Sequence, residues 1–326
     1  MNIMKLYIKK RKFSVRRNHF KAISYVAIIA LFSVFVSCYE SYIKDYDYTG
    51  VCFGTQQPVR TLVARSDNDY LEFRIGVALG GVRENNKEYS VEFMVDPDLL
   101  NTVERASKFT LLPEDCYVID NPNNTFIIPK GKMLGDCPVR ILKTKFTDLP
   151  NSLDSTYVLP LRLVATTADS ILSDKDYTII VIKYISEYSG NYYCKGSQSE
   201  WDGSNAIQGT TTTYSLDDLV KNKIRQLTTH SLTEFDTDGM GTLSIRDSGG
   251  TAAANHFRIS LNADGEVNLS TIPGCNQITD RGSSYNAETK TFTLNYIYTK
   301  GDKSYVVNED LILRQDVEKD LRFGTW

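Results

Sequence analysis

The sequence predicts an all-β protein with an N-terminal immunoglobulin-like β-sandwich at residues 50–185 and a second β domain at 186–326. Two observations support this fold class. Apolar and polar side chains alternate along many short segments, which is the period of a half-buried strand. Pro, Gly, Asn and Asp bound these segments, and the loops between them are too short for the helices that a parallel sheet needs. Short strands at this spacing are typical of a β-sandwich.

The beginning of the chain predicts export. Eight Lys and Arg residues and no acidic residue precede Cys38, and this charge bias holds a leader on the cytoplasmic side. The apolar run Ala22–Cys38 fits a secretory signal better than a membrane span. It ends in Phe35-Val36-Ser37-Cys38, which resembles the lipobox of bacterial lipoproteins. Residues 1–37 are therefore expected to be a signal peptide and Cys38 the lipidated residue, with an uncleaved membrane helix as the alternative.

Residues 38–49 read as a flexible acidic tether. Acidic residues after a lipidated cysteine resemble the surface-export signal of Bacteroidota lipoproteins, so we expect the protein on the outer membrane, lipid-anchored and facing the cell exterior. From Cys38 onward, 29 basic and 40 acidic residues leave a net charge of −11. This charge disfavours nucleic acid or an anionic membrane surface as a partner, because both require clustered Lys and Arg.

The cysteine spacing indicates neither a disulfide framework nor a metal site. Six cysteines are far apart in the sequence, and lipidation of Cys38 leaves an odd number. A Cys116–Cys137 disulfide is one alternative and buried free thiols are the other.

Strand patterns follow one another through the first domain. Residues 70–79 alternate strictly, Gly80-Gly81 then turns the chain, and 89–95 repeat the alternation, which predicts a hairpin. Asp96-Pro97 is expected to open a short helix to about Ala106, with Asp96 as its N-cap. Further strands are expected at 109–112, 125–128, 139–143, 157–165 and 177–184.

The second domain begins where the composition changes to Gly, Ser, Thr and Tyr, after residues 186–191. A short helix is expected at 216–225, and Thr291–Tyr298 alternates most clearly, with aromatic side chains on one face. The other expected strands are at 211–216, 241–246, 256–261, 266–269 and 304–314. An antiparallel sandwich and a lipocalin-like barrel both fit, since both alternate along every strand.

Three segments of the first domain carry a family resemblance. Ile127-Ile128-Pro129-Lys130-Gly131, Tyr157–Ala165 (YVLPLRLVA) and the strand ending Ile182-Lys183-Tyr184 resemble the N-terminal β-sandwich domain of unknown function in Bacteroidota glycan-utilisation lipoproteins. Tyr285–Phe292 and its aromatic strand resemble the C-terminal β domain that accompanies it. The resemblance implies a surface glycan-binding protein that works with an outer-membrane importer and its surface lipoproteins.

The residues give no sign of an enzyme. Some proteins with this first domain continue into a chitinase-type glycosidase barrel, but the second domain lacks the length and the alternating helices of one, and there is no DxxDxDxE run. No HExxH, GxSxG or phosphate-binding loop is present. Asp236–Asp247 partly resembles a calcium loop, although Met240 stands where an oxygen ligand is needed, and a polar turn explains it as well. We therefore expect no catalytic residues, no metal and no cofactor.

Trp201 is the predicted centre of a ligand site. It lies in a polar stretch, with Glu200, Asp202 and Asn205 as secondary candidates, and such a group can stack on a sugar and bind its hydroxyls. Tyr285 is a further candidate. The alternative is that Trp201 folds back onto the core as a loop anchor.

The expected function is non-catalytic capture of a glycan at the cell surface. A fimbrial or adhesin-type lipoprotein is the alternative, and an unrecognised glycosidase is a third. The identity of the glycan and the oligomeric state stay open.

Overall fold

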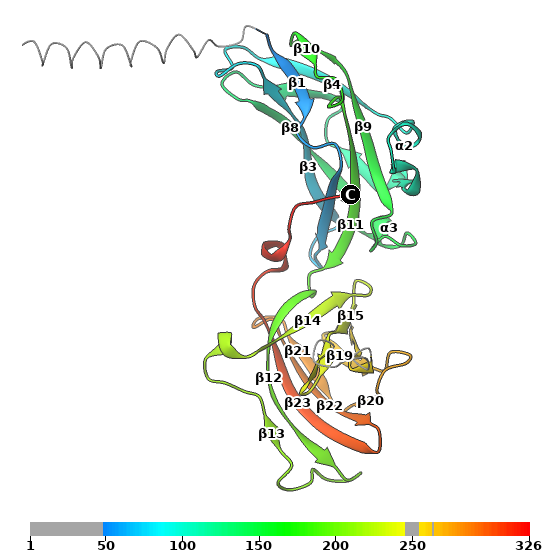
Figure 1. Cartoon of the computed structure of the whole chain (residues 1–326), viewed down its shortest axis with the longest axis vertical. Coiled ribbons are helices and arrows are strands. Elements are labelled where there is room, and N and C mark those ends of the chain that lie inside the picture. The colour runs from blue at the N-terminus through cyan, green and yellow to red at the C-terminus, as the bar shows by residue number, and fades with distance from the viewer. Residues whose placement is uncertain (1–47, 245–253, 263) are drawn as a thin grey trace, which may run out of the picture.

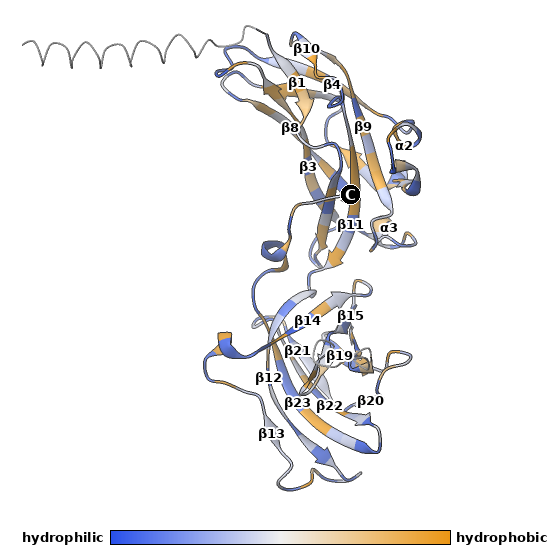
Figure 2. Ribbon diagram, in the orientation of Figure 1, coloured by the Kyte–Doolittle hydropathy of each residue, from blue (hydrophilic) through white to orange (hydrophobic). Residues whose placement is uncertain are grey.

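The computed structural model describes residues 48–244, 254–262 and 264–326. Two β domains are stacked end to end along the long axis of the molecule (Figure 1). Hydrophobic and hydrophilic residues alternate along strands of both domains (Figure 2), as expected when each strand has one buried face. Within these described residues no helix has the length and apolar character that crossing a bilayer requires. The predicted signal peptide, Cys38 and Asp247 lie outside the described residues.

The N-terminal domain is the expected sandwich of two sheets. The first sheet has the order β10 (Ser170–Ile171), β1 (Gly50–Phe53), β3 (Tyr70–Gly80), β8 (Leu134–Leu142) and β6 (Tyr117–Ile119). The second has the order β24 (Gly324–Thr325), β2 (Pro58–Ala64), β11 (Tyr177–Ser186), β9 (Tyr157–Thr166), β4 (Tyr89–Val95) and β7 (Thr125–Ile128), with β5 (Thr110–Leu111) beside β9.

The predicted hairpin of 70–79 with 89–95 is wrong. Strand β3 pairs with β1 and β8, whereas β4 pairs with β7 and β9 in the opposite sheet. The alternation of both strands was assigned correctly, and their apolar faces meet across the core instead of along one ladder. The period of a strand identifies its buried face but not its hydrogen-bonding partner.

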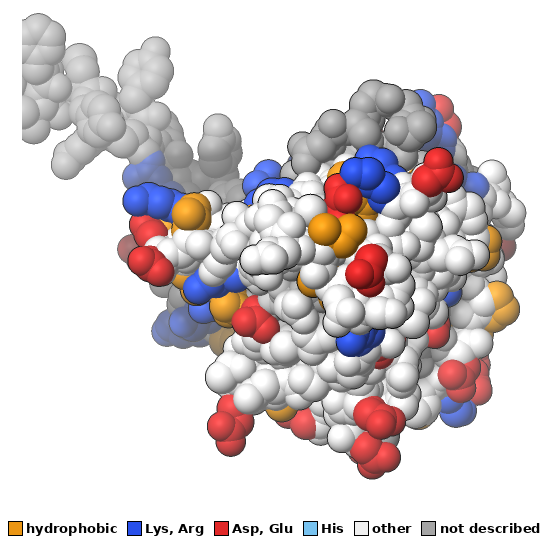
Figure 3. Space-filling model, turned by 90° about the horizontal axis from the view of Figure 1, so that it is seen from below, with side chains coloured by type: hydrophobic (Ala, Val, Ile, Leu, Met, Phe, Trp, Pro, Cys, Tyr) orange, Lys and Arg blue, Asp and Glu red, His pale blue; other side chains and the backbone are white. Residues whose placement is uncertain are grey.

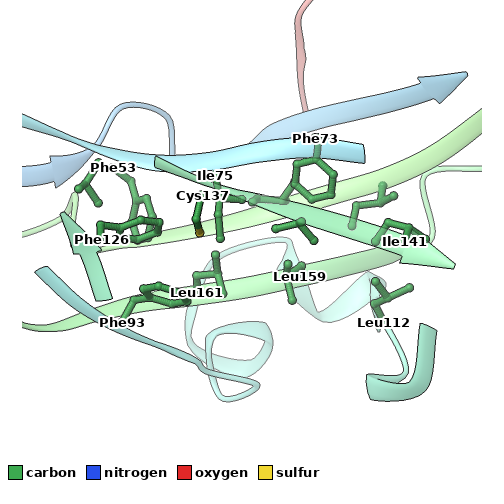
Figure 4. Close-up of a cluster of buried hydrophobic side chains, with 14 of the residues drawn as sticks. Phe53, Phe73, Ile75, Phe93, Leu112, Phe126, Cys137, Ile141, Leu159 and Leu161 are labelled. Carbon is green, nitrogen blue, oxygen red and sulfur yellow. The ribbon is translucent and has the colours of Figure 1, made fainter. Parts of the chain in front are cut away.

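Aromatic and aliphatic side chains from both sheets fill the space between them (Figure 4). Phe93 stacks on Phe126 at 4.4 Å between ring centroids, and Phe53 meets Phe126 edge-on at 6.3 Å. Cys116 and Cys137 are buried and free, so the disulfide alternative is excluded and the buried-thiol alternative is confirmed for this pair. Burial raises the pKa of both thiols.

The expected helix from Pro97 to Ala106 is broken into α2 (Leu99–Thr102) and a 3₁₀ turn, η1 (Ala106–Lys108). Val103 is extended and Arg105 is left-handed, at φ 66°, which interrupts the helix. The N-cap position of α2 is Asp98 and not the expected Asp96. Asp96 Oδ1 still accepts from the Asp98 amide at 3.1 Å, ahead of the helix, while its Oδ2 pairs with Arg162 at 2.6 Å. The other short helices of the domain are η2 (Glu114–Cys116) and α3 (Lys143–Thr147).

The second domain is a closed antiparallel barrel, which decides between the two expected folds. Eight of the described strands close it, in the order β12 (Gly190–Trp201), β14 (Lys223–Thr229), β15 (Glu234–Thr237), β18 (Arg258–Leu261), β19 (Glu266–Ser270), β21 (Ser283–Asn286), β22 (Thr291–Lys300) and β23 (Lys303–Leu313). Strand β23 pairs with β12 over ten residue pairs and completes the ring.

Smaller elements complete the domain. Strands β13 (Thr212–Thr213) and β20 (Ile278–Asp280) extend the barrel sheet, and β16 (Gly239–Met240) pairs with β17 (Leu243–Ser244) in a separate hairpin. The helix expected at 216–225 is a single turn, η3 (Leu219–Lys221), followed by β14. The Asn222 side chain accepts from the Leu216 amide at 2.8 Å and donates to three carbonyls of the loop, so the chain is held in a turn.

The C-terminal segment returns from the barrel to the first domain, where the C-terminus lies (Figure 1). After β23 the chain forms the turn η6 (Val317–Asp320) and then strand β24, which pairs with β2. The indole of Trp326 donates to the Ile179 carbonyl at 2.9 Å and packs against Phe109 at 4.7 Å. The chain therefore links its two domains twice.

Candidate functional site

The barrel interior contains a charged network and is not an apolar cup. Arg225 and Glu309 point inward from β14 and β23 and are buried, with Glu309 3% exposed. The carboxylate of Glu309 accepts from Tyr296 at 2.7 Å, from Tyr214 at 2.8 Å and from the Cys194 thiol at 3.3 Å. Arg225 Nη2 lies 3.9 Å from Glu309 Oε2. Such a network is stable only because nearly every polar atom has a partner.

Burial controls the protonation of this network. Desolvation raises the pKa values of Tyr296, Tyr214 and Cys194 well above their usual ranges, and the nearby carboxylate of Glu309 raises them further. Desolvation opposes the charge of Arg225, but the groups around it, Glu309 first among them, together outweigh desolvation and raise the pKa of Arg225. At neutral pH the phenols and the thiol are therefore neutral donors around one carboxylate.

The β16–β17 hairpin occupies the space against this network. The Gly241 amide donates to the Tyr296 hydroxyl at 2.7 Å, and Arg225 donates to the carbonyls of Gly241 and Leu243 at 3.0 and 3.2 Å. A Cβ on Gly239 would lie 1.7 Å from Arg225 Nη1, so only glycine fits there. The hairpin thus packs against the inward-facing side chains of Arg225 and Tyr296.

Trp201 is on the outer surface, at the end of the barrel farthest from the first domain (Figure 1). It is the last residue of β12 and pairs with Ser304 of β23, so it lies in a strand and not in the loop that the sequence indicated. The Arg281 guanidinium stacks over its ring at 4.9 Å from the centroid. The Trp201 side chain is partly buried. It is therefore neither fully displayed to solvent, as a ligand site would favour, nor folded into the core as a loop anchor.

Asp202 and Asn205 form the exposed turn that follows Trp201. Asp202 Oδ1 accepts from the Ser204 amide at 2.8 Å and the Asn205 amide at 2.7 Å. These two backbone donors lower the pKa of Asp202, which keeps it charged. Asp202 Oδ1 therefore holds the turn in shape. Asn205 is an exposed residue of this turn.

The other two predicted residues are elsewhere. Neighbouring residues of a strand point to opposite faces, so Glu200 faces the barrel mouth, where it pairs with Lys303 at 2.6 Å. Tyr285 lies at the opposite end of the barrel, where it pairs with Phe292 of β22. Trp201 pairs with Ser304 of β23, which pairs in turn with Thr299 of β22, seven residues along that strand from Phe292. At about 3.3 Å per residue this separation is roughly 23 Å. The structure brings Trp201, Asp202 and Asn205 together, and Tyr285 is apart.

The outer face around Trp201 combines short polar side chains with the apolar Ile297 and Val306, which pair with each other across β22 and β23. Cross-strand pairing places short hydroxyl and amide side chains beside it on β12, β23 and β22, namely Ser197, Ser304, Asn308, Thr299 and Asn295. Viewed from this end of the molecule, charges of both signs are scattered among uncharged polar groups (Figure 3). We call Trp201, the Arg281 side chain that stacks on it, the turn 202–205 and these five side chains the barrel-end platform.

Arg281 is a residue of this platform that the sequence analysis missed. It lies between β20 and β21, far from Trp201 in the sequence, and no local motif marks it. Only the closure of the barrel brings the two side chains together.

Two family models match the sequence. One, described as an N-terminal domain, matches residues 42–170, and the other, described as a C-terminal domain, matches residues 176–312. The second match begins just before β11 (Tyr177–Ser186), so it includes this strand of the sandwich together with the barrel strands. No curated protein matches the sequence.

One solved structure from Bacteroides shares the fold, and two others are similar at lower scores. A protein of unknown function from Bacteroides ovatus has a TM-score of 0.65 at 18% identity, over 86% of this chain and 98% of its own. An auxiliary nutrient binding protein from Bacteroides thetaiotaomicron has a TM-score of 0.38 at 14% identity, over 81% and 92%. A putative carbohydrate binding protein from Bacteroides ovatus has a TM-score of 0.33 at 11% identity, over 82% and 99%. The predicted resemblance to two-domain Bacteroidota proteins is thus confirmed.

Proposed function

The chain belongs to a family of two-domain β proteins, defined by the N-terminal domain matched at residues 42–170 and the C-terminal domain matched at residues 176–312, and from this we propose its function. The protein is a non-catalytic binding protein that captures an oligosaccharide or polysaccharide at the barrel-end platform. The observation that carries this proposal is the indole of Trp201, held on the outer barrel face by Arg281 and next to the exposed turn 202–205.

The platform has the chemistry that a neutral glycan needs. The aliphatic face of a sugar ring stacks on an indole, and the ring hydroxyls bond to short hydroxyl and amide side chains such as Ser304 and Asn308. A cation over the indole holds the ring plane in place and contributes about 0.5–1 kcal/mol at an exposed site. The scattered charges and the net −11 of the chain after residue 37 argue against a polyanionic glycan.

The location and the partners belong to the same proposal. The basic leader, the apolar run and Phe35-Val36-Ser37-Cys38 support a lipid anchor at Cys38 and a place on the outer membrane, facing the cell exterior. There the protein passes captured glycan to an outer-membrane importer and its surface lipoproteins. The stacked domains support a spacer role for the sandwich, which holds the barrel-end platform away from the anchor.

A binding screen tests the proposal. The chain from Tyr39 onward is assayed against neutral host and plant polysaccharides by affinity electrophoresis. We expect at least one to be retained, with affinity reduced about tenfold or more in Trp201→Ala, and about two- to fivefold in Arg281→Met because the cation–π contact is lost.

Tyr70→Ala is the matched control. Tyr70 is also a surface aromatic, 46% exposed, under an arginine, Arg140, at 5.8 Å, but it lies in the first domain. This variant should bind like the unmodified chain. If no polysaccharide binds at millimolar levels, or if Tyr70→Ala loses binding as much as Trp201→Ala, glycan capture at the platform is rejected and the adhesin alternative becomes the better one.

A further inference from the structure

A pocket of about 440 Å³ lies where the two domains meet. The first domain contributes Lys143 to its wall, the barrel contributes Leu232 and Leu261, and the linker contributes Glu187 and Tyr188. Pockets of this volume hold small organic ligands, and domain junctions are frequent places for them. The pocket is separate from the barrel-end platform, because the length of β12 between Gly190 and Trp201 is roughly 36 Å at about 3.3 Å per residue.

Connections on both sides of the pocket hold the domains in position. At the linker, the Ser186 amide donates to Thr229 Oγ1 at 3.0 Å and its hydroxyl donates to the Leu232 carbonyl at 2.9 Å. On the returning C-terminal segment, Arg65 pairs with Asp316 at 3.0 Å and with Glu318 at 3.1 Å, before β24 joins β2. Because the chain connects the domains twice, the pocket is preformed, and binding does not require ordering the domains.

The polar groups of the pocket carry opposite charges and keep hydrogen-bonding capacity. Lys143 Nζ donates to the carbonyls of Arg65 at 2.7 Å and Ser66 at 3.4 Å, and an ammonium has three donors. Glu187 Oε1 accepts from the Ser66 amide at 2.6 Å, which leaves the second carboxylate oxygen as an acceptor. Arg65 also lines the pocket, and Asp316 and Glu318 balance its charge. With that cation balanced, Lys143 and Glu187 give the wall a donor, an acceptor and little net charge.

An aromatic ring and aliphatic side chains form the rest of the wall. The Tyr188 ring is fixed by Phe235 at 5.5 Å and Tyr285 at 5.3 Å, so it presents a set orientation. Leu232 and Leu261 add apolar surface next to it. Burial raises the pKa of Tyr188, so its hydroxyl is a neutral donor and acceptor at physiological pH.

We propose that this junction pocket binds a neutral saccharide of one or two rings. A sugar hydroxyl can accept a hydrogen bond from Lys143 and donate one to Glu187. An anion is repelled by Glu187 and a cation by Lys143, so neither fits both groups as well as a neutral hydroxyl does. The apolar face of the ring packs on Tyr188 and Leu232. The pocket is then a second carbohydrate site, for a short saccharide or a chain end, and it does not depend on polymer capture at the barrel-end platform.

Saturation-transfer NMR on the chain from Tyr39 onward tests the site. The probes are neutral mono- and disaccharides and the corresponding uronic acids, at millimolar concentration. Thr233→Trp places a bulky side chain at the exposed pocket edge and should abolish the saccharide signal, while Lys143→Met and Glu187→Gln should weaken binding about tenfold. Lys145→Met is the matched control for Lys143, since Lys145 pairs with Asp115 outside the pocket.

The variants separate this site from the platform. The saccharide signal should survive in Trp201→Ala, and polymer retention should survive in Thr233→Trp. The proposal is overturned if no neutral saccharide gives a signal that Thr233→Trp removes, if Lys145→Met weakens binding as much as Lys143→Met, or if a uronic acid binds more tightly than its neutral counterpart. Circular dichroism of each variant shows that the fold is retained.

Discussion

Replacing the buried Glu309 with Leu should destabilise the barrel by about 3–5 kcal/mol, the range found when one partner of a buried ion pair is removed. The substitution takes the acceptor from Tyr296, Tyr214 and Cys194 at once. It also leaves the buried Arg225 with Asp238, at 3.7 Å, as its nearest acidic group. Each unsatisfied buried donor costs about 1–3 kcal/mol, so several such losses together fill the expected range.

Two further variants show whether charge or hydrogen bonding dominates. Glu309→Gln keeps one carbonyl acceptor and should lose only about 1–3 kcal/mol. The double variant Arg225→Leu with Glu309→Leu should be more stable than the sum of the single losses, because neither member of the buried pair is then left without the other.

Urea unfolding measures these effects in the barrel alone. In a Trp326→Phe background the remaining tryptophan, Trp201, is in the barrel, so its fluorescence reports this domain. The reasoning about the network is refuted if Glu309→Leu changes the free energy of unfolding by less than about 1 kcal/mol. Strict additivity of the Arg225 and Glu309 substitutions would also contradict it, since it would mean that the two groups do not interact.

Two other predictions concern the aromatic residues. Burial raises the pKa of Tyr285 to about 12 in the folded protein, compared with about 10 in the unfolded chain. The neutral phenol therefore contributes its full stabilisation below about pH 10, and the barrel should lose stability as the pH rises from about 10 to 12. The ultraviolet absorbance of tyrosinate, recorded with unfolding, checks this, and complete titration of the folded protein near pH 10 would contradict it. Trp326→Ala should destabilise the first domain by roughly 1–2 kcal/mol, less than a fully buried aromatic, because it removes the bond to Ile179 and the contact with Phe109. Thermal unfolding compared with Phe323→Ala, an aromatic that is 60% exposed, measures this, and equal melting temperatures of the two variants would disprove the anchoring role.

Alternation along the strands predicted most of the fold. The buried faces of β3, β4 and β22 follow directly from their sequences, because a half-buried strand repeats every two residues. The partner of each strand did not follow. Strand β3 pairs with β1 and β8 and not with β4. The apolar face of β3 is buried equally well whether β4 lies beside it in the same sheet or opposite it in the other sheet, so the alternation does not distinguish the two arrangements.

The candidate sites were predicted in part. The polar turn after Trp201 is local, and Asp202 and Asn205 lie in it because they follow Trp201 in the sequence. Arg281 and the junction pocket were missed because their residues come together only when the barrel closes and the C-terminal segment returns.

The sequence by itself determined the all-β class, the boundary near residue 186 and the polar character of the Trp201 region, because periodicity and composition are local properties of the chain. Tertiary structure decided that the second domain is a barrel, that the β16–β17 hairpin bonds to Arg225 and Tyr296 on its inner side, and that the last strand belongs to the first domain. These features depend on contacts between residues far apart in the sequence, and such contacts leave no period along the chain.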